Sequence, residues 1–91
     1  MHVRNIKTVQ YHRKFLSRFQ DLPLNIQSLA KKKEQWFLAK PFDARLKTHK
    51  LKGELDGYWS YSVNFQYRIL FRFIENDEVI YYDIGTHAIY G

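Results

Sequence analysis

The 91-residue sequence predicts an α+β fold in which a two-helix hairpin packs on one face of a mostly antiparallel, twisted sheet. Three observations support this prediction. A β-branched segment opens the chain, two amphipathic segments with helical spacing follow, and three β-rich runs with short connections close it. The expected order is β-α-α-β-β-β, and a chain of this length is expected to form one domain over residues 1–91.

The first half contains a strand and the helical hairpin. Residues 3–11 are rich in β-branched side chains and partly alternate, which predicts a strand. From His12 onward the apolar residues recur at helical spacing, which predicts a first helix of about ten residues. Pro23 separates it from a second helix over residues 24–40, because proline ends one helix and favours the first turn of the next. Pro41 ends that second helix.

The second half is expected to be β-structure. Residues 42–57 are polar, basic and turn-like, and three strands are predicted after them, over 58–64, 67–74 and 79–85. Their short connections favour an antiparallel meander. Alternate side chains of a strand share one face, so Arg68 and Arg72 are expected to point away from the core.

The composition argues against several classes of protein. The chain has no cysteine, which rules out disulfides, thiolate metal sites and a cysteine nucleophile, and which fits a reducing cytoplasm. No apolar run approaches the roughly 18 residues of a membrane-spanning helix, and residues 1–5 lack the apolar region of a secretory signal. The four histidines lack metal-ligand spacing, so we expect no metal and no other cofactor.

The positive charge is concentrated in the first half of the chain. Residues 1–52 carry 13 Lys and Arg against 3 acidic residues, whereas residues 53–91 carry 2 against 6. A basic half of this strength indicates an anionic partner, such as nucleic acid or an acidic protein segment. Helices with solvated, lysine-rich outer faces explain the same charge equally well.

Four groups of side chains could carry chemistry. His87 follows the last predicted strand and could transfer a proton near neutral pH, although a lone histidine is most often a solvated surface residue. Arg68 could bind phosphate from an exposed sheet face, whereas ordinary polar-outward alternation is sufficient for Arg72. Most aromatic residues are expected in the core, with one or two on the arginine face available to stack bases. A basic loop could contact a phosphate backbone or be only a charged surface; it contains Arg45, Lys47, His49, Lys50 and Lys52.

In their order and spacing these residues resemble the RelE/ParE superfamily of bacterial type II toxins, most closely the YafQ-like and RelE-like ribosome-dependent mRNA interferases. The resemblance implies the RelE-like fold. It also implies metal-independent endoribonuclease activity, in which a ribose 2′-hydroxyl of mRNA attacks the adjacent phosphate in the ribosomal decoding site. The implied partners are the ribosome, mRNA and a cognate antitoxin. The resemblance rests on Tyr11–Leu16, Leu22-Pro23, His49–Gly53, Gly57-Tyr58, Tyr67–Phe71 and Asp83–His87.

The resemblance also implies roles for single residues. It makes His87 the acid–base residue and Arg68 the residue that holds the scissile phosphate, with His49 and Tyr90 assisting. A second histidine and an aspartate of YafQ-like toxins are missing here, where Ser62 and Gln66 stand, so the division of the proton-transfer roles stays open. Together, the basic segments and the resemblance predict eight RNA- and ribosome-binding residues: Lys31, Lys32, Lys33, Arg45, Lys47, Lys50, Lys52 and Arg72.

Two other functions are compatible with the sequence. A ParE-like gyrase inhibitor would have this fold without a nuclease site, and the terminal His87 argues against it. A non-catalytic member that only binds an antitoxin or RNA remains open, because the hairpin histidine and aspartate are absent. Fold alone does not decide among the three functions.

Overall fold

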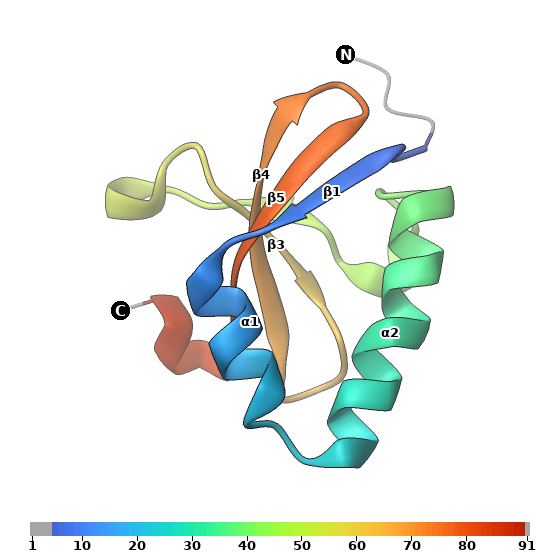
Figure 1. Cartoon of the computed structure of the whole chain (residues 1–91). Helices are drawn as coiled ribbons and strands as arrows, with labels where there is room; N and C mark the ends of the chain where they lie inside the picture. Colours follow the sequence, from blue (N-terminus) through green and yellow to red (C-terminus); the bar gives the residue numbers. More distant parts are fainter. Residues whose placement is uncertain (1–4, 91) are drawn as a thin grey trace.

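The computed structural model describes residues 5–90, and the backbone alone for Ala88 and Tyr90. It confirms the predicted α+β class, with both helices beside one sheet (Figure 1). The helices and strands are β1 (Thr8–Tyr11), α1 (Arg13–Gln20), α2 (Leu24–Ala39), β2 (His49–Lys50), β3 (Trp59–Ser62), β4 (Arg68–Glu75) and β5 (Glu78–Gly85). The connections contain the short 3-10 helices η1 (Ala44–Leu46), η2 (Gly53–Leu55) and η3 (His87–Tyr90).

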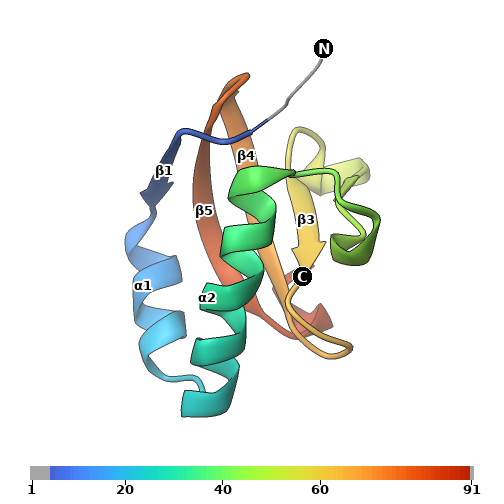
Figure 2. The same ribbon diagram turned by 90° about the vertical axis from the view of Figure 1, so that its right-hand side faces the viewer.

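The sheet has five strands in the order β1-β5-β4-β3-β2. The predicted meander is confirmed, because β3, β4 and β5 pair antiparallel in succession. β1 pairs parallel to β5, which is possible because the two-helix hairpin and the meander separate them in the chain. Figure 2 shows α1 and α2 side by side in front of the sheet.

Two expectations about the strands were wrong. The segment 42–57 is not only turns, because His49 and Lys50 form β2 and pair with Ser60 and Trp59. So short a strand shows no periodicity in the sequence, and the neighbouring strand defines it. The first strand begins at Thr8 rather than residue 3; residues 3 and 4 lie outside the described chain, and 5–7 form no strand.

The helix boundaries agree with the prolines that predicted them. α1 ends at Gln20 and α2 begins directly after Pro23. The ring of His12 caps α1, since its Nδ1 accepts a hydrogen bond from the backbone N–H of Lys14 at 3.1 Å. α2 ends at Ala39, one residue earlier than predicted.

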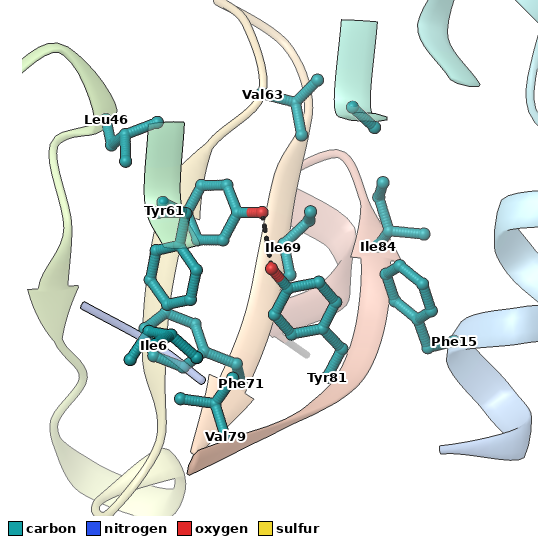
Figure 3. Packing of buried hydrophobic residues seen from close by; sticks show 12 residues of the cluster. Ile6, Phe15, Leu46, Tyr61, Val63, Ile69, Phe71, Val79, Tyr81 and Ile84 are labelled. Atoms are coloured by element: carbon teal, nitrogen blue, oxygen red, sulfur yellow. Dashed lines mark hydrogen bonds between the residues drawn. The ribbon is translucent and has the colours of Figure 1, made fainter. Parts of the chain in front are cut away.

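Aromatic rings form the centre of the core between α2 and the sheet. The ring of Phe37 stacks on Tyr61 with centroids 4.5 Å apart and meets Phe71 edge to face at 4.9 Å. The hydroxyl groups of Tyr61 and Tyr81 are 3.0 Å apart and satisfy each other by a hydrogen bond inside the apolar core (Figure 3). This hydrogen bond gives each of the two buried hydroxyl groups a polar partner.

A β-bulge in β5 decides which side chains reach the other face. Leu70 pairs with Asp83, but Phe71 pairs with Tyr81, so Tyr82 is the extra residue. Tyr81 points into the core, while Tyr82 and Asp83 both point away from α2. We call the sheet face turned away from α2 the outer face. In Figure 1, η3 lies on this side of the sheet.

Candidate active site on the outer face

The sheet register brings Arg68 and His87 to one end of the outer face. Arg68 begins β4 and pairs with Gly85, the last residue of β5. His87 follows two residues later, at the start of η3, and its side chain is exposed. Two residues that are 19 positions apart in the chain are therefore neighbours in the fold. Both were predicted from the sequence as functional residues.

The guanidinium group of Arg68 also organises the loop between β3 and β4. Its Nη1 donates hydrogen bonds to the backbone oxygens of Asn64 at 2.7 Å, Tyr67 at 3.2 Å and Phe65 at 3.3 Å. All hydrogen bonds seen for this guanidinium within residues 5–90 use Nη1. Because arginine has further donors on Nε and Nη2, a bound phosphate can still be contacted from the same side chain.

A buried carboxylate that the sequence analysis did not select lies beside this pair. Asp83 is 1% exposed, and its Oδ1 accepts a hydrogen bond from the N–H of Ile84 at 2.9 Å. Its Oδ2 lies 3.3 Å from Nζ of Lys14, and its Oδ1 lies 3.7 Å from Nε of Arg18. The sequence held one indication of such a site: Lys14 and Arg18 are four residues apart, so they share one side of a helix and can both approach a single carboxylate.

The tail packs closely over the end of β5. A Cβ atom built on Gly85 would lie 2.6 Å from Cγ2 of Ile89 and 3.9 Å from Nη1 of Arg18. A side chain at this position would therefore displace the tail. The glycine lets η3, which begins with His87, lie against the outer face beside α1.

His49 shares the outer face but stands apart from Arg68. The register aligns His49, Ser60, Leu70 and Asp83 in one row across four strands. Strand spacing puts the Cα atoms of His49 and Arg68 about 12 Å apart. The Nδ1 of His49 is 2.9 Å from the backbone oxygen of Lys47, which assigns the hydrogen of the neutral ring to Nδ1 and leaves Nε2 as an acceptor.

The remaining predicted site residues fall into separate regions. Arg72 lies on the outer face, but Lys50 pairs with Trp59, which points to the opposite face, so the structure separates Lys50 from His49. Lys47 and Lys52 are exposed on the connections that flank β2. The side chain of Tyr90 lies outside the described residues. Ser62 pairs with Arg68 and Gln66 is exposed in the adjoining loop, so the two hairpin positions flank Arg68 without a carboxylate.

A second basic region surrounds Trp36 on the helical side. The guanidinium of Arg45 lies 3.7 Å from the centroid of the Trp36 ring, and Nζ of Lys33 lies 3.9 Å from it. Arg45 also forms a two-bonded pair with Asp43, at 2.9 and 3.1 Å, and these hydrogen bonds lower the pKa of Asp43 to about 2. Partial burial, and then the charge of Lys32, lower the pKa of Lys33. The structure does not bring this region to Arg68 and His87.

A cavity of about 200 Å³ lies on the helical side as well. Its walls come from α1, α2 and the core side of the sheet, and include Phe15, Leu16 and Phe19. At its rim the hydroxyl of Tyr11 donates to Oε2 of Glu34 at 2.8 Å, and burial together with this carboxylate raises the pKa of Tyr11. The cavity does not include Arg68 or His87.

Residues 5–90 contain no candidate for a metal centre or for a membrane span. No group of three or more histidine, aspartate or glutamate side chains in this range is arranged to hold a metal ion. Neither helix in the same range is both long and apolar enough to cross a membrane.

Comparison with known proteins identifies the relatives of this fold. The profile of a protein family described as RelE-like toxin of type II toxin-antitoxin system HigB matches residues 10–87. No curated protein sequence matches significantly.

Solved structures agree on the fold. The chain is similar to the toxin–antitoxin complex RelBE2 from Mycobacterium tuberculosis, with 22% identity, a TM-score of 0.75, and 97% of each chain covered. It is also similar to YafQ from Escherichia coli (19%, TM-score 0.72, 90% of this chain and 94% of YafQ). A third similar structure is a YoeB/ParE toxin from Agrobacterium tumefaciens, with 16% identity, a TM-score of 0.73, and 89% of this chain and 99% of that chain covered.

Proposed function

The chain belongs to the RelE-like toxins of type II toxin–antitoxin systems, and on this premise we propose that it is a ribosome-dependent mRNA interferase. The observation that carries the proposal is the position of Arg68 opposite Gly85, with His87 two residues further along. A guanidinium and an imidazole at one end of the outer face provide a phosphate ligand and a proton-transfer group.

Cleavage of RNA without a metal has a short list of requirements. The ribose 2′-oxygen attacks the adjacent phosphorus while the bond to the 5′-oxygen breaks, leaving a 2′,3′-cyclic phosphate and a 5′-hydroxyl. One group must accept the proton of the 2′-hydroxyl, another must give a proton to the leaving oxygen, and cations must stabilise the crowded phosphate. We assign one proton transfer to His87 and the charge stabilisation to Arg68.

The neighbouring residues support these two. Lys14 and Arg18 add positive charge beside the tail, although Asp83 partly neutralises them. His49 lies two strands away from Arg68 on the outer face, and we assign it to an adjacent nucleotide. The basic region around Trp36 faces elsewhere and is suited to ribosomal RNA.

The proposal includes partners and a location. RelBE2 and the similar DinJ-YafQ structure from Escherichia coli are both described as toxin–antitoxin complexes. We propose that this chain likewise binds a cognate antitoxin, with an acidic segment that covers basic surface of the toxin. Because the proposed target is the translating ribosome, the expected location is the cytoplasm.

The test is cleavage of a defined mRNA on programmed ribosomes, with a ribosome-free reaction beside it. Wild type, His87→Ala, Arg68→Ala and His49→Ala are compared after circular dichroism has shown that each is folded. We expect ribosome-dependent cleavage, a loss of ~10²-fold or more for His87→Ala, and a smaller loss for His49→Ala.

Two outcomes would count against the proposal. If His87→Ala cleaves mRNA as fast as wild type does, His87 does not transfer the proton. A folded wild-type chain that cleaves nothing on ribosomes contradicts the interferase function, and inhibition of DNA supercoiling by gyrase is then measured with the same preparation.

A further inference from the structure

A row of rings on the outer face has no role in the chemistry described above. The ring centroids of His12 and Tyr82 are 5.2 Å apart, and those of Tyr82 and Tyr58 are also 5.2 Å apart, in an edge-to-face arrangement. The guanidinium of Arg72 lies 5.6 Å from the Tyr58 ring. The four side chains come from four separate segments of the chain, so only the folded sheet assembles this row.

These rings are not part of the core. His12 and Arg72 are exposed, and Tyr58 and Tyr82 are half-buried, whereas Tyr81, the neighbour of Tyr82, is 1% exposed. Tyr82 directly follows Tyr81 on β5 and points to the other face of the sheet, away from the aromatic core that Tyr81 joins. Packing of the core therefore does not explain why three rings are gathered on this face.

The row is held in a defined geometry. The Nδ1 of His12 accepts from the N–H of Lys14, which fixes the imidazole at the start of α1. Tyr82 contacts the rings of His12 and Tyr58, one on each side along the row. A preformed row of this kind loses little conformational freedom when a planar ligand stacks on it.

Charge indicates the kind of ligand. Cations stand on both sides of the rings, with Arg72 at one end and Lys14 and Arg18 on α1 at the other. Aromatic faces combined with flanking cations are the features with which proteins bind single-stranded nucleic acid, because every base has a face that can stack. A peptide segment that is acidic would be attracted by the cations but would not use the rings.

We propose that His12, Tyr82 and Tyr58 form a stacking platform for bases of single-stranded RNA beside the scissile phosphate. This inference rests on the proposed function and deepens it. Strand spacing puts the Cα of Tyr82 about 10 Å from that of Gly85, which pairs with Arg68, so one RNA strand can lie over both. Stacking reads no hydrogen-bond pattern, so the platform holds the RNA without selecting a particular base.

The main test measures stacking directly and does not depend on cleavage. Ribosomes are programmed with an mRNA that carries 2-aminopurine beside the intended cleavage position and a 2′-O-methyl group that blocks the reaction. Wild type and His87→Ala are expected to quench the 2-aminopurine fluorescence, because the base stacks on Tyr82. Tyr82→Leu is expected to lose the quenching, whereas Tyr82→Phe is expected to keep it, which separates stacking from misfolding.

A cleavage assay with unmodified mRNA gives the second measurement. We expect Tyr82→Leu and Tyr58→Leu each to lower kcat/KM by ~10–100-fold, the range for losing one stacked base. Phe42→Leu is the matched control, because Phe42 is 46% exposed and packs on Trp59 and Phe73 on the opposite face. It is expected to cleave as wild type does.

The outcomes separate the platform from the interferase function. Suppose that wild type cleaves mRNA, and that Tyr82→Leu matches wild type in both cleavage and 2-aminopurine quenching. The platform proposal is then wrong, while the proposed function stands. If folded wild type does not cleave but quenches through Tyr82, the platform is supported and the interferase function is wrong. If folded wild type does not quench at all, the platform is wrong.

Discussion

The carboxylate of Asp83 lies 3.3 Å from the ammonium group of Lys14, and this contact joins β5 to α1 across the outer face. Asp83 is 1% exposed, while the side chains of Lys14 and Arg18 around it are more than half exposed. A buried charge is stable only when it is paired and hydrogen-bonded. The pair therefore ties the position of α1 to the end of the sheet where Arg68 pairs with Gly85.

Replacement of this carboxylate tests how much the contact stabilises the fold. We expect Asp83→Asn to lower the free energy of unfolding by ~1–2 kcal/mol, a modest loss because solvent screens the two exposed cations. Urea unfolding followed by circular dichroism measures it. Asp77→Asn is the control, since Asp77 meets Lys7 at 4.0 Å on the exposed surface and should change the stability by less than ~0.5 kcal/mol. An Asp83→Asn variant as stable as wild type would show that desolvation of the carboxylate cancels the attraction.

Close packing over Gly85 predicts a change in activity that a second substitution reverses. Gly85→Ala would bring a methyl group against Ile89 and displace η3, so we expect cleavage to fall by ~10-fold or more through misplacement of His87. The double variant Gly85→Ala with Ile89→Ala makes room for the methyl group and should recover much of the activity. Cleavage kinetics and thermal unfolding of both variants are compared with those of Ile89→Ala alone. A double variant no better than Gly85→Ala would show that the crowding is not the cause.

Ionisation of the buried tyrosine pair links stability to alkaline pH. Burial raises the pKa values of Tyr61 and Tyr81 above their usual 10.0. The folded state therefore favours the protonated hydroxyls, and their contribution is complete below pH 10 and is lost as the pH rises further. A spectroscopic titration of tyrosinate should show these two groups ionising together with unfolding, after the exposed tyrosines. In the double variant Tyr61→Phe, Tyr81→Phe this last ionisation phase should disappear. If it persists, it arises from other tyrosines.

Charge reversal on α2 tests the basic region around Trp36 separately from the outer face. We expect the triple variant Lys31→Glu, Lys32→Glu, Lys33→Glu to bind ribosomes more weakly and with a smaller dependence on salt, because fewer counterions are released. The rate at saturating ribosomes should stay close to that of wild type, since the outer face is unchanged. Co-sedimentation with ribosomes over a series of salt concentrations measures the binding. If the affinity and its salt dependence match those of wild type, the three lysines are only a solvated face.

Local signals made the helices and the meander predictable. Pro23 and Pro41 mark helix ends by a steric rule that acts within a few residues: α1 ends three residues before Pro23, and α2 begins directly after Pro23 and ends two residues before Pro41. The long strands β4 and β5 are visible in the sequence as runs rich in β-branched and aromatic residues. The two residues of β2 do not, because the neighbouring β3 and not their own pattern makes them a strand.

By itself, the sequence determined the fold class and the order of the main elements, and it singled out two candidate functional residues by type, Arg68 and His87. Only the tertiary structure decided which residues accompany them. Strict alternation would place Asp83 with Val79 and Tyr81 in the core, but the bulge turns Asp83 outward to Lys14 and Ile84 into the core. The physical reason is that a bulge depends on the register between two strands, and a register is a property of the pair and not of either segment alone.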